Sequence, residues 1–232
     1  GLPEWMGQLA ALTTLDLSHC DSLTGLPESM GRLAALTTLD LSGCNSLTGL
    51  PESMGQLAAL TTLNLMDCGS LTGLPESMGQ LEALTTLYLN SCGSLTGLPE
   101  SMGQLTGLTA LVLSGCDSLT KLPESMARLP DHLALQVSYC NLMFPPQHVA
   151  QNGIRAIRAF FQACANGTSA LQHDRLMLLG DGGAGKTTLA MALRLHADRE
   201  NYLPQLHASL RDRLLHHWDA ADMRRWLQEL DP

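Results

Sequence analysis

The sequence predicts an α/β solenoid with a parallel sheet on its concave face and short helices on its convex face. A partial α/β unit built around a phosphate loop, and then helices, are expected to follow it. Two observations support this prediction: a 24-residue unit recurs over residues 1–144, and a glycine-rich segment at 180–187 follows a short apolar run. Apolar residues make up 45% of the chain but aromatic residues only 4%. Leucine therefore supplies most of the buried surface, as is typical of stacked repeats.

The repeat unit reads GLPESMGQLAALTTLDLSGCNSLT. Close copies start at residues 1, 25, 49, 73 and 97, and a more divergent copy starts at residue 121. In the first copy, Leu12, Leu15, Leu17 and Cys20 follow the spacing L-x-x-L-x-L-x-x-C. This spacing resembles the leucine-rich repeat family over residues 1–144. The resemblance implies a solenoid in which every coil stacks on its neighbour.

The same solenoid follows from the residues. Leu15 and Leu17 lie two positions apart, so both point to one face of a short strand. One coil cannot bury these leucines alone, so the coils must stack and build a parallel sheet. One cysteine per unit is expected to face the interior as a free thiol. These cysteines are Cys20, Cys44, Cys68, Cys92, Cys116 and Cys140.

On the convex side, Pro27 is expected to open a short helix or 3₁₀ turn, with Glu28 near its positive end. Gly31 is expected to limit the length of that helix. Near the end of the array, Phe144 is expected to cover the last coil, and Pro145-Pro146 to stop the sheet. The first coil is expected to be open or to belong to a longer array.

The outward positions of the strands form the candidate partner-binding surface, because they alternate with buried leucines. These positions differ between copies whereas the core positions barely change. Two explanations fit this pattern: neutral drift at exposed positions, and a surface diversified to bind a protein or peptide. Comparison of the repeat copies with one another slightly favours the second. The candidate residues are Asp16, Ser18, Asp40, Ser42, Asn64, Met66, Tyr88, Asn90, Val112 and Ser114.

A connecting helix and loop are expected over residues 145–173, with Ile154, Ile157, Phe160 and Phe161 on one apolar face. A strand, loop and helix over 174–200 and a helical tail over 201–232 complete the predicted organisation.

The segment at 180–187 matches G-x-x-x-x-G-K-[ST], the P-loop, directly after the apolar run 175–179. Lys186 is expected to reach the β- and γ-phosphates of a nucleotide, and the Thr187 hydroxyl to bind Mg²⁺. A dinucleotide fingerprint also fits the glycines, with Glu200 as its acid, but residues 194–199 do not read as the strand it needs. The predicted phosphate-binding residues are Gly180, Asp181, Gly182, Gly183, Ala184, Gly185, Lys186, Thr187 and Thr188.

Repeats followed by a connecting helix and this P-loop resemble the Roco family, which implies a Ras-like GTPase domain that uses GTP and Mg²⁺. Two alternatives stay open: an ATP-binding, resistance-type switch protein, and a pure repeat scaffold with a vestigial P-loop. No glycine follows Gly185 and no lysine follows Lys186. The D-x-x-G and N-K-x-D elements are therefore missing, so we expect no hydrolysis by these 232 residues and assign no catalytic residue.

Charge and cysteine usage exclude several classes of partner. Residues 1–144 carry three Lys/Arg against thirteen Asp/Glu, which argues against nucleic acid. No signal peptide and no apolar run of membrane-spanning length is present, so no membrane partner is expected. Seven cysteines, an odd number, favour reduced thiols and a cytoplasmic location.

Overall fold

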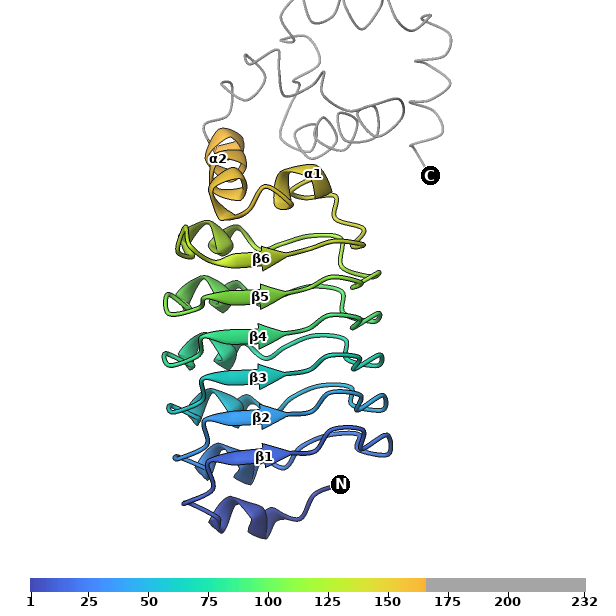
Figure 1. Cartoon of the computed structure of the whole chain (residues 1–232), viewed down its shortest axis with the longest axis vertical. Coiled ribbons are helices and arrows are strands. Elements are labelled where there is room, and N and C mark those ends of the chain that lie inside the picture. Colours follow the sequence, from blue (N-terminus) through green and yellow to red (C-terminus); the bar gives the residue numbers. More distant parts are fainter. Residues whose placement is uncertain (166–232) are drawn as a thin grey trace, which may run out of the picture. The chain divides into compact units, whose positions relative to one another are not determined.

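The computed structural model describes residues 1–165. They form a stack of six coils, each with one 3₁₀ helix and one strand, followed by two α-helices (Figure 1). The strands are β1 (Thr14–Asp16), β2 (Thr38–Asp40), β3 (Thr62–Asn64), β4 (Thr86–Tyr88), β5 (Ala110–Val112) and β6 (Ala134–Gln136). The 3₁₀ helices are η1 (Glu4–Gln8), η2 (Glu28–Arg32), η3 (Glu52–Gln56), η4 (Glu76–Gln80), η5 (Glu100–Gln104) and η6 (Glu124–Arg128).

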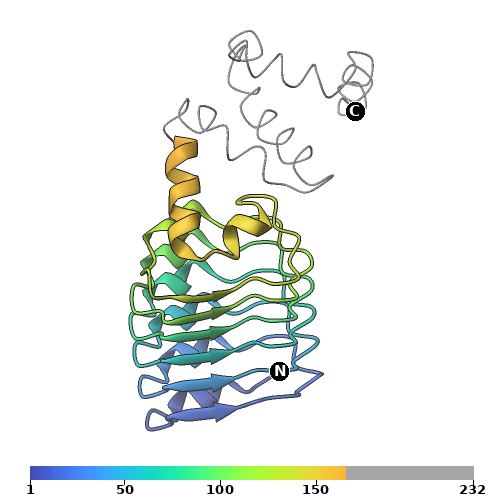
Figure 2. The same cartoon turned by 45° about the horizontal axis from the view of Figure 1, so that its top comes forward.

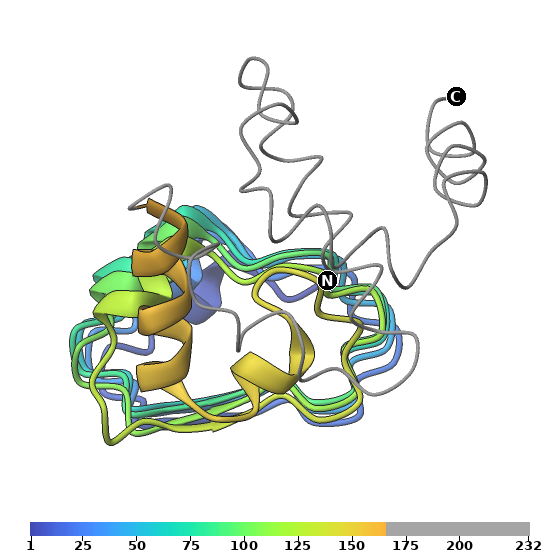
Figure 3. The ribbon, with the colours of Figure 1, turned by 90° about the horizontal axis from the view of Figure 1, so that it is seen from above.

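The six strands form one parallel sheet in sequence order, which confirms the predicted sheet. Each residue pairs with its equivalent 24 positions later, as Leu15 does with Leu39 and Leu39 with Leu63. Viewed from above, the coils superimpose (Figure 3), and strands and helices lie on different sides of each coil (Figures 2 and 3). One 24-residue repeat of the sequence therefore forms one coil of the stack.

Leucines of the inner coils form a continuous core. The side chains of Leu39, Leu63 and Leu87 are completely buried, whereas Leu15 and Leu17 in the first coil are only partly buried. The first coil lacks a neighbour on one side among the described residues, and β1 is the edge of the sheet.

The cysteines of coils 2 to 6 are buried, as the sequence predicts, and their thiols also link consecutive coils. The Sγ of Cys44 donates a hydrogen bond to the carbonyl oxygen of Leu17 at 3.2 Å, and Cys92 does the same to Leu65 at 3.1 Å. Burial raises the pKa of the Cys68 thiol to about 12. These thiols are therefore protonated donors at neutral pH, and only Cys20 of the ladder is exposed.

The convex turns are 3₁₀ helices, and Glu28 lies in the first turn of η2, as expected. The structure adds a contact to the next coil that the sequence did not predict. The Glu28 carboxylate accepts a hydrogen bond from the Ser53 backbone N–H in the next coil, at 3.2 Å. Glu52 repeats this contact with Ser77 at 3.1 Å. Each glutamate therefore stabilises the positive end of its neighbour's helix.

Gly31 is required by packing between coils rather than by helix length. A Cβ at Gly31 would lie 2.4 Å from the Ser53 carbonyl oxygen and 2.8 Å from its Cβ. Gly7 lies in the same way over Ser29. The first coil has Trp5 at the serine position, and this side chain is 59% exposed.

Phe144 covers the last coil, as predicted. Its ring centroid lies 5.1 Å from that of Phe160 and 5.5 Å from that of Phe161, both edge-to-face. The expected connecting helix is divided into α1 (Gln147–Ala150) and α2 (Ile154–Ala165). Gly153, at φ +82°, separates them because it adopts a left-handed conformation that ends the first helix.

The second helix packs against η6 and is fixed by charged groups. The Arg155 Nε donates to the Asp131 carboxylate at 2.9 Å, and Arg158 donates to the other carboxylate oxygen at 2.5 Å. Arg158 also donates to the carbonyl oxygens of Ala127 and Leu129. Alanine fits at 127, where earlier coils have glycine, because a helix and not a seventh coil follows it.

Candidate binding face

The predicted partner-binding residues lie in two rows across the strands, which we call the sheet face. The middle row comprises the third residue of each strand: Asp16, Asp40, Asn64, Tyr88, Val112 and Gln136. The outer row lies two positions further along each coil and comprises Ser18, Ser42, Met66, Asn90, Ser114 and Ser138. All ten predicted residues therefore belong to these two rows, together with Gln136 and Ser138.

The two rows are not equally accessible. Tyr88 and Met66 expose 38% and 36% of their surface, the largest apolar exposures in the two rows. Ser42 is only 6% exposed, so its side chain offers little surface to a partner. The exposed apolar part of the sheet face is thus centred on coils 3 and 4.

Three middle-row residues also have a structural role that the sequence reasoning missed. Asp40 accepts a hydrogen bond from the Ser42 backbone N–H at 2.8 Å, and Asn64 accepts one from Met66 at 3.1 Å. Asp16 does the same in the first coil. The signal was present in the sequence, since Asp and Asn commonly bond the backbone two residues on.

Charge is concentrated at the start of the sheet face. The Ser18 backbone N–H holds the pKa of Asp16 below its ordinary value, so this carboxylate is ionised at neutral pH. Asp40 lies directly beside Asp16 in the neighbouring strand. Within residues 1–165 the ion pairs are those of Asp131 with Arg155 and Arg158. Neither row contains Lys or Arg.

A third row borders the sheet face at the turn that follows each strand, and sequence reasoning missed it. Its members adopt the left-handed conformation, which glycine tolerates best. Two members, Gly43 and Gly115, are glycines and adopt this conformation without strain. The other four are His19 at φ +57°, Asp67 at +58°, Ser91 at +61° and Tyr139 at +57°. Tyr139 is also 85% exposed.

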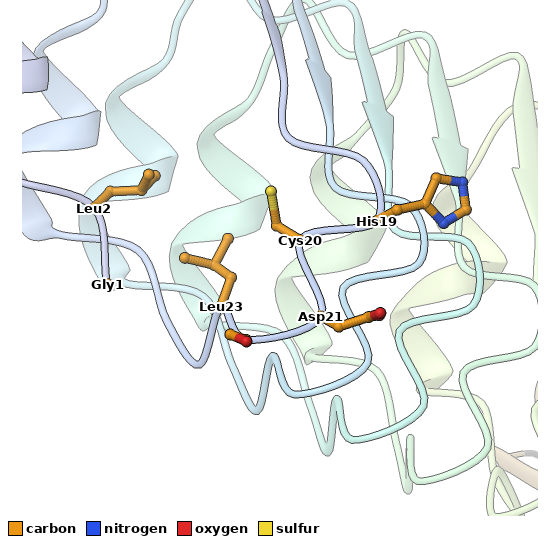
Figure 4. Close-up of a pocket in the computed structure, with 7 residues that line it drawn as sticks. Gly1, Leu2, His19, Cys20, Asp21 and Leu23 are labelled. Carbon is orange, nitrogen blue, oxygen red and sulfur yellow. The ribbon is translucent and has the colours of Figure 1, made fainter.

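The open end of the first coil contains a shallow hollow of about 500 Å³ (Figure 4). Leu2, Cys20 and Leu23 contribute to its lining, while His19 and Asp21 point away from Leu2. No group of three His, Cys, Asp or Glu side chains arranged to bind a metal occurs in the described part of the chain. The hollow is the uncovered end of the leucine core rather than a chemical site.

The predicted phosphate loop, Gly180–Thr188, lies outside the described residues, as do Lys186 and the predicted Mg²⁺ ligand Thr187. The predicted units at 174–200 and 201–232 also lie outside them. Among the helices that are described, none is long and apolar enough to cross a membrane.

Comparisons with known proteins address the repeats. A search of curated proteins gave no match. Similar solved structures include the leucine-rich repeat domain of the type III effector XopL, with 26% identity over 59% of this chain and 64% of that chain and a TM-score of 0.37. A plant ice-binding protein has 25% identity over 61% of this chain and 58% of that chain, with a TM-score of 0.48.

A chain from the BIR3–SERK2 complex of Arabidopsis thaliana has 27% identity over 56% of this chain and 69% of that chain, with a TM-score of 0.42. The chain spans 53% to 64% of the length of the first three similar structures. Residues 12–69 match the family described as leucine rich repeat. Together with the six stacked coils and their 24-residue register, this match supports a leucine-rich repeat solenoid for the six coils.

Proposed function

We propose that the sheet face binds a protein or peptide. The observation that carries this proposal is the contrast between inward and outward residues of the same strands. The inward residue is leucine in all six strands, from Leu15 in β1 to Leu135 in β6. Beside it, the middle row changes from Asp40 to Asn64 to Tyr88 in consecutive coils. A constant core with a changing outer surface is typical of a scaffold adapted for recognition.

Hydrogen bonds between coils pre-organise the scaffold, which favours binding because less conformational entropy is lost when a partner docks. Two threonine ladders join the coils in addition to the sheet. The Thr61 hydroxyl donates to the Thr37 carbonyl oxygen at 3.0 Å, and the Thr72 hydroxyl to that of Thr48 at 3.3 Å. Tyr88 and Met66 are thus held on a fixed platform.

Site-specific photo-cross-linking in cells tests this proposal. A benzophenone amino acid replaces Tyr88 in the full chain, and a matched variant carries it at Glu82, an exposed position where all three earlier coils have alanine. We expect covalent protein adducts, identified by mass spectrometry, at position 88 and not at position 82. Equal cross-linking at both positions, or none at position 88, would refute the assignment of binding to the sheet face.

A second function, Roco-like binding of GTP with Mg²⁺, is favoured by the full P-loop match at 180–187. In that function Lys186 contacts the phosphates and Thr187 binds Mg²⁺. Titration of the full chain with GTP and with ATP, with and without Mg²⁺ and beside Lys186→Ala, tests it. We expect very weak binding, lost in the variant, and no hydrolysis. Tighter binding of ATP favours a resistance-type switch, and no binding of either nucleotide leaves only the interaction function.

We also propose a cytoplasmic location. Each buried thiol donates a hydrogen bond to the preceding coil, as Cys68 does to the Leu41 carbonyl oxygen at 3.2 Å. Only a reduced thiol can donate this bond, so a reducing compartment suits the array. Fractionation of cells that express the native gene tests this location.

A further inference from the structure

The chemistry of the sheet face changes along the stack. Coils 1 and 2 present the carboxylates of Asp16 and Asp40, whereas coils 3 and 4 present Met66 and Tyr88. We propose that the partner is an extended polypeptide segment that places a lysine or arginine against coils 1 and 2 and a large apolar side chain against coils 3 and 4. This inference rests on the proposed function of the sheet face and adds the chemistry and direction of the partner.

The carboxylates define the cationic end. Asp16 and Asp40 are register partners in β1 and β2, so their charges lie on neighbouring strands about 4.8 Å apart. Like charges directly opposite each other in a sheet are destabilising. Within residues 1–165 neither carboxylate forms an ion pair. A cation supplied by a partner would relieve this repulsion.

The turn hydrogen bonds leave both carboxylates able to bind that cation. Asp16 uses one oxygen, Oδ1, for the Ser18 backbone N–H. Asp40 uses Oδ1 for Ser42 and accepts a bond from the Asn64 side chain at Oδ2, at 3.0 Å. Because each carboxylate oxygen has two acceptor positions, lone pairs remain on both side chains.

The apolar end is defined by two adjacent side chains. Tyr88 is the register partner of Asn64, and Met66 lies two residues beyond Asn64 on the same face. The fold does not require either of them, because Asn64 and Ser42 occupy the corresponding positions in preceding coils. An exposed tyrosine beside an exposed methionine suits an aromatic or long aliphatic side chain.

The spacing between the two ends predicts a sequence pattern in the partner. Tyr88 lies three strands beyond Asp16, which corresponds to about 14 Å at about 4.8 Å per strand. An extended chain rises about 3.3 Å per residue, and every second side chain points to the same side. Positions i and i+4 therefore span about 13 Å on one side. We expect the cation and the apolar residue four positions apart.

A display library of random twelve-residue peptides, selected against the full chain, tests the inference without knowledge of the natural partner. The Kd values of the selected peptides are then measured by fluorescence anisotropy for the full chain and its variants. The charge variant is the double change Asp16→Asn and Asp40→Asn. Asn64 shows that asparagine keeps the turn hydrogen bond, so this variant removes charge while preserving the turns. Glu82→Gln is the matched control because it removes an exposed charge away from the sheet face.

We expect the selected peptides to carry Lys or Arg with a large apolar residue four positions away. The double Asp variant should weaken their binding about tenfold at low salt and less at high salt, because two exposed ion pairs are lost and salt screens them. Tyr88→Ala should weaken binding by about tenfold or more, and Glu82→Gln should have no effect.

Three results would overturn the inference. Peptides that bind through Tyr88 but lack a cation, or ignore the double Asp variant, would refute it and leave the proposed function standing. Peptides unaffected by both sets of variants would refute the inference and also count against the sheet face as the binding surface. Failure to select any peptide would exclude an extended segment, and the cross-linking at Tyr88 would then decide whether a folded partner binds there.

Discussion

The close contact between coils at glycine makes a quantitative prediction for Gly55→Ala. A Cβ at Gly55 would lie 2.5 Å from the Ser77 carbonyl oxygen and 2.7 Å from the Ser77 Cβ. Both atoms belong to the next coil, so relief requires the two coils to separate. Overpacking of this kind costs about 1–3 kcal/mol, whereas replacement of glycine by alanine gains about 0.4–1 kcal/mol through the unfolded chain. We expect a net loss of about 1–2 kcal/mol in the free energy of unfolding.

Gly49→Ala is the matched control, because a Cβ at Gly49 would meet no atom within 4 Å. This change should leave stability unchanged or raise it by up to about 1 kcal/mol. Urea unfolding followed by circular dichroism measures both variants in the full chain. Hydrogen exchange of the amides in coils 3 and 4 shows whether the loss is local. Equal stability of the two variants would refute the reasoning and show that the coils separate without cost.

Three further predictions concern the turns, the thiols and the first coil. Ser91→Gly should raise the free energy of unfolding by about 0.5–1 kcal/mol because φ +61° is strained for serine. Gly115→Ala should lower the free energy of unfolding, because it places a side chain at φ +80°. Urea unfolding that showed the reverse order of stabilities would contradict this prediction. Iodoacetamide at pH 8 should alkylate Cys20, which is exposed, long before the buried Cys68, as mass spectrometry can show. Folding raises the pKa of Cys68 from 9.0 to about 12, so the folded state holds the thiol proton more tightly than the unfolded chain does. The stabilisation from this thiol is therefore complete below pH 9 and is lost as the pH rises from 9 toward 12. Urea midpoints of unfolding that stay constant over this range would exclude this stabilisation. A consensus coil fused before residue 1 should raise the melting temperature more when Trp5→Ser accompanies it, because the serine position lies under a glycine of the preceding coil; an equal rise with Trp5 retained would refute this.

Much of the array follows from residue spacing, because each coil obeys local rules. The alternation of Leu15 and Leu17 around Asp16 predicts which side chains enter the core, and the structure confirms it in the inner coils. The periodic cysteines are predicted as inward thiols, and Cys44 to Cys140 are buried and bonded to the preceding coil. The partner-binding role of the sheet face and the phosphate loop stay predictions.

Other roles depend on a neighbour that is 24 to 27 residues away in the chain and cannot be deduced within one coil. Glu28 lies beside the start of its own helix in the sequence, yet its carboxylate bonds to Ser53 of the next coil. The sequence likewise gives Gly31 a local reason, whereas the structure shows contact with Ser53.

The sequence by itself determined the period, the leucine core, the parallel sheet and the inward thiols. The reason is that backbone geometry fixes which face of a strand each residue points to once its position in the repeat is known. Only the tertiary structure decided which residues join one coil to the next and how the stack ends. It also showed that the Asp40 carboxylate, on the sheet face, accepts the backbone hydrogen bond that begins the following turn. The physical reason is that stacking brings each inner coil within hydrogen-bonding distance of two others, and the role of a side chain there depends on which groups the neighbouring coil presents.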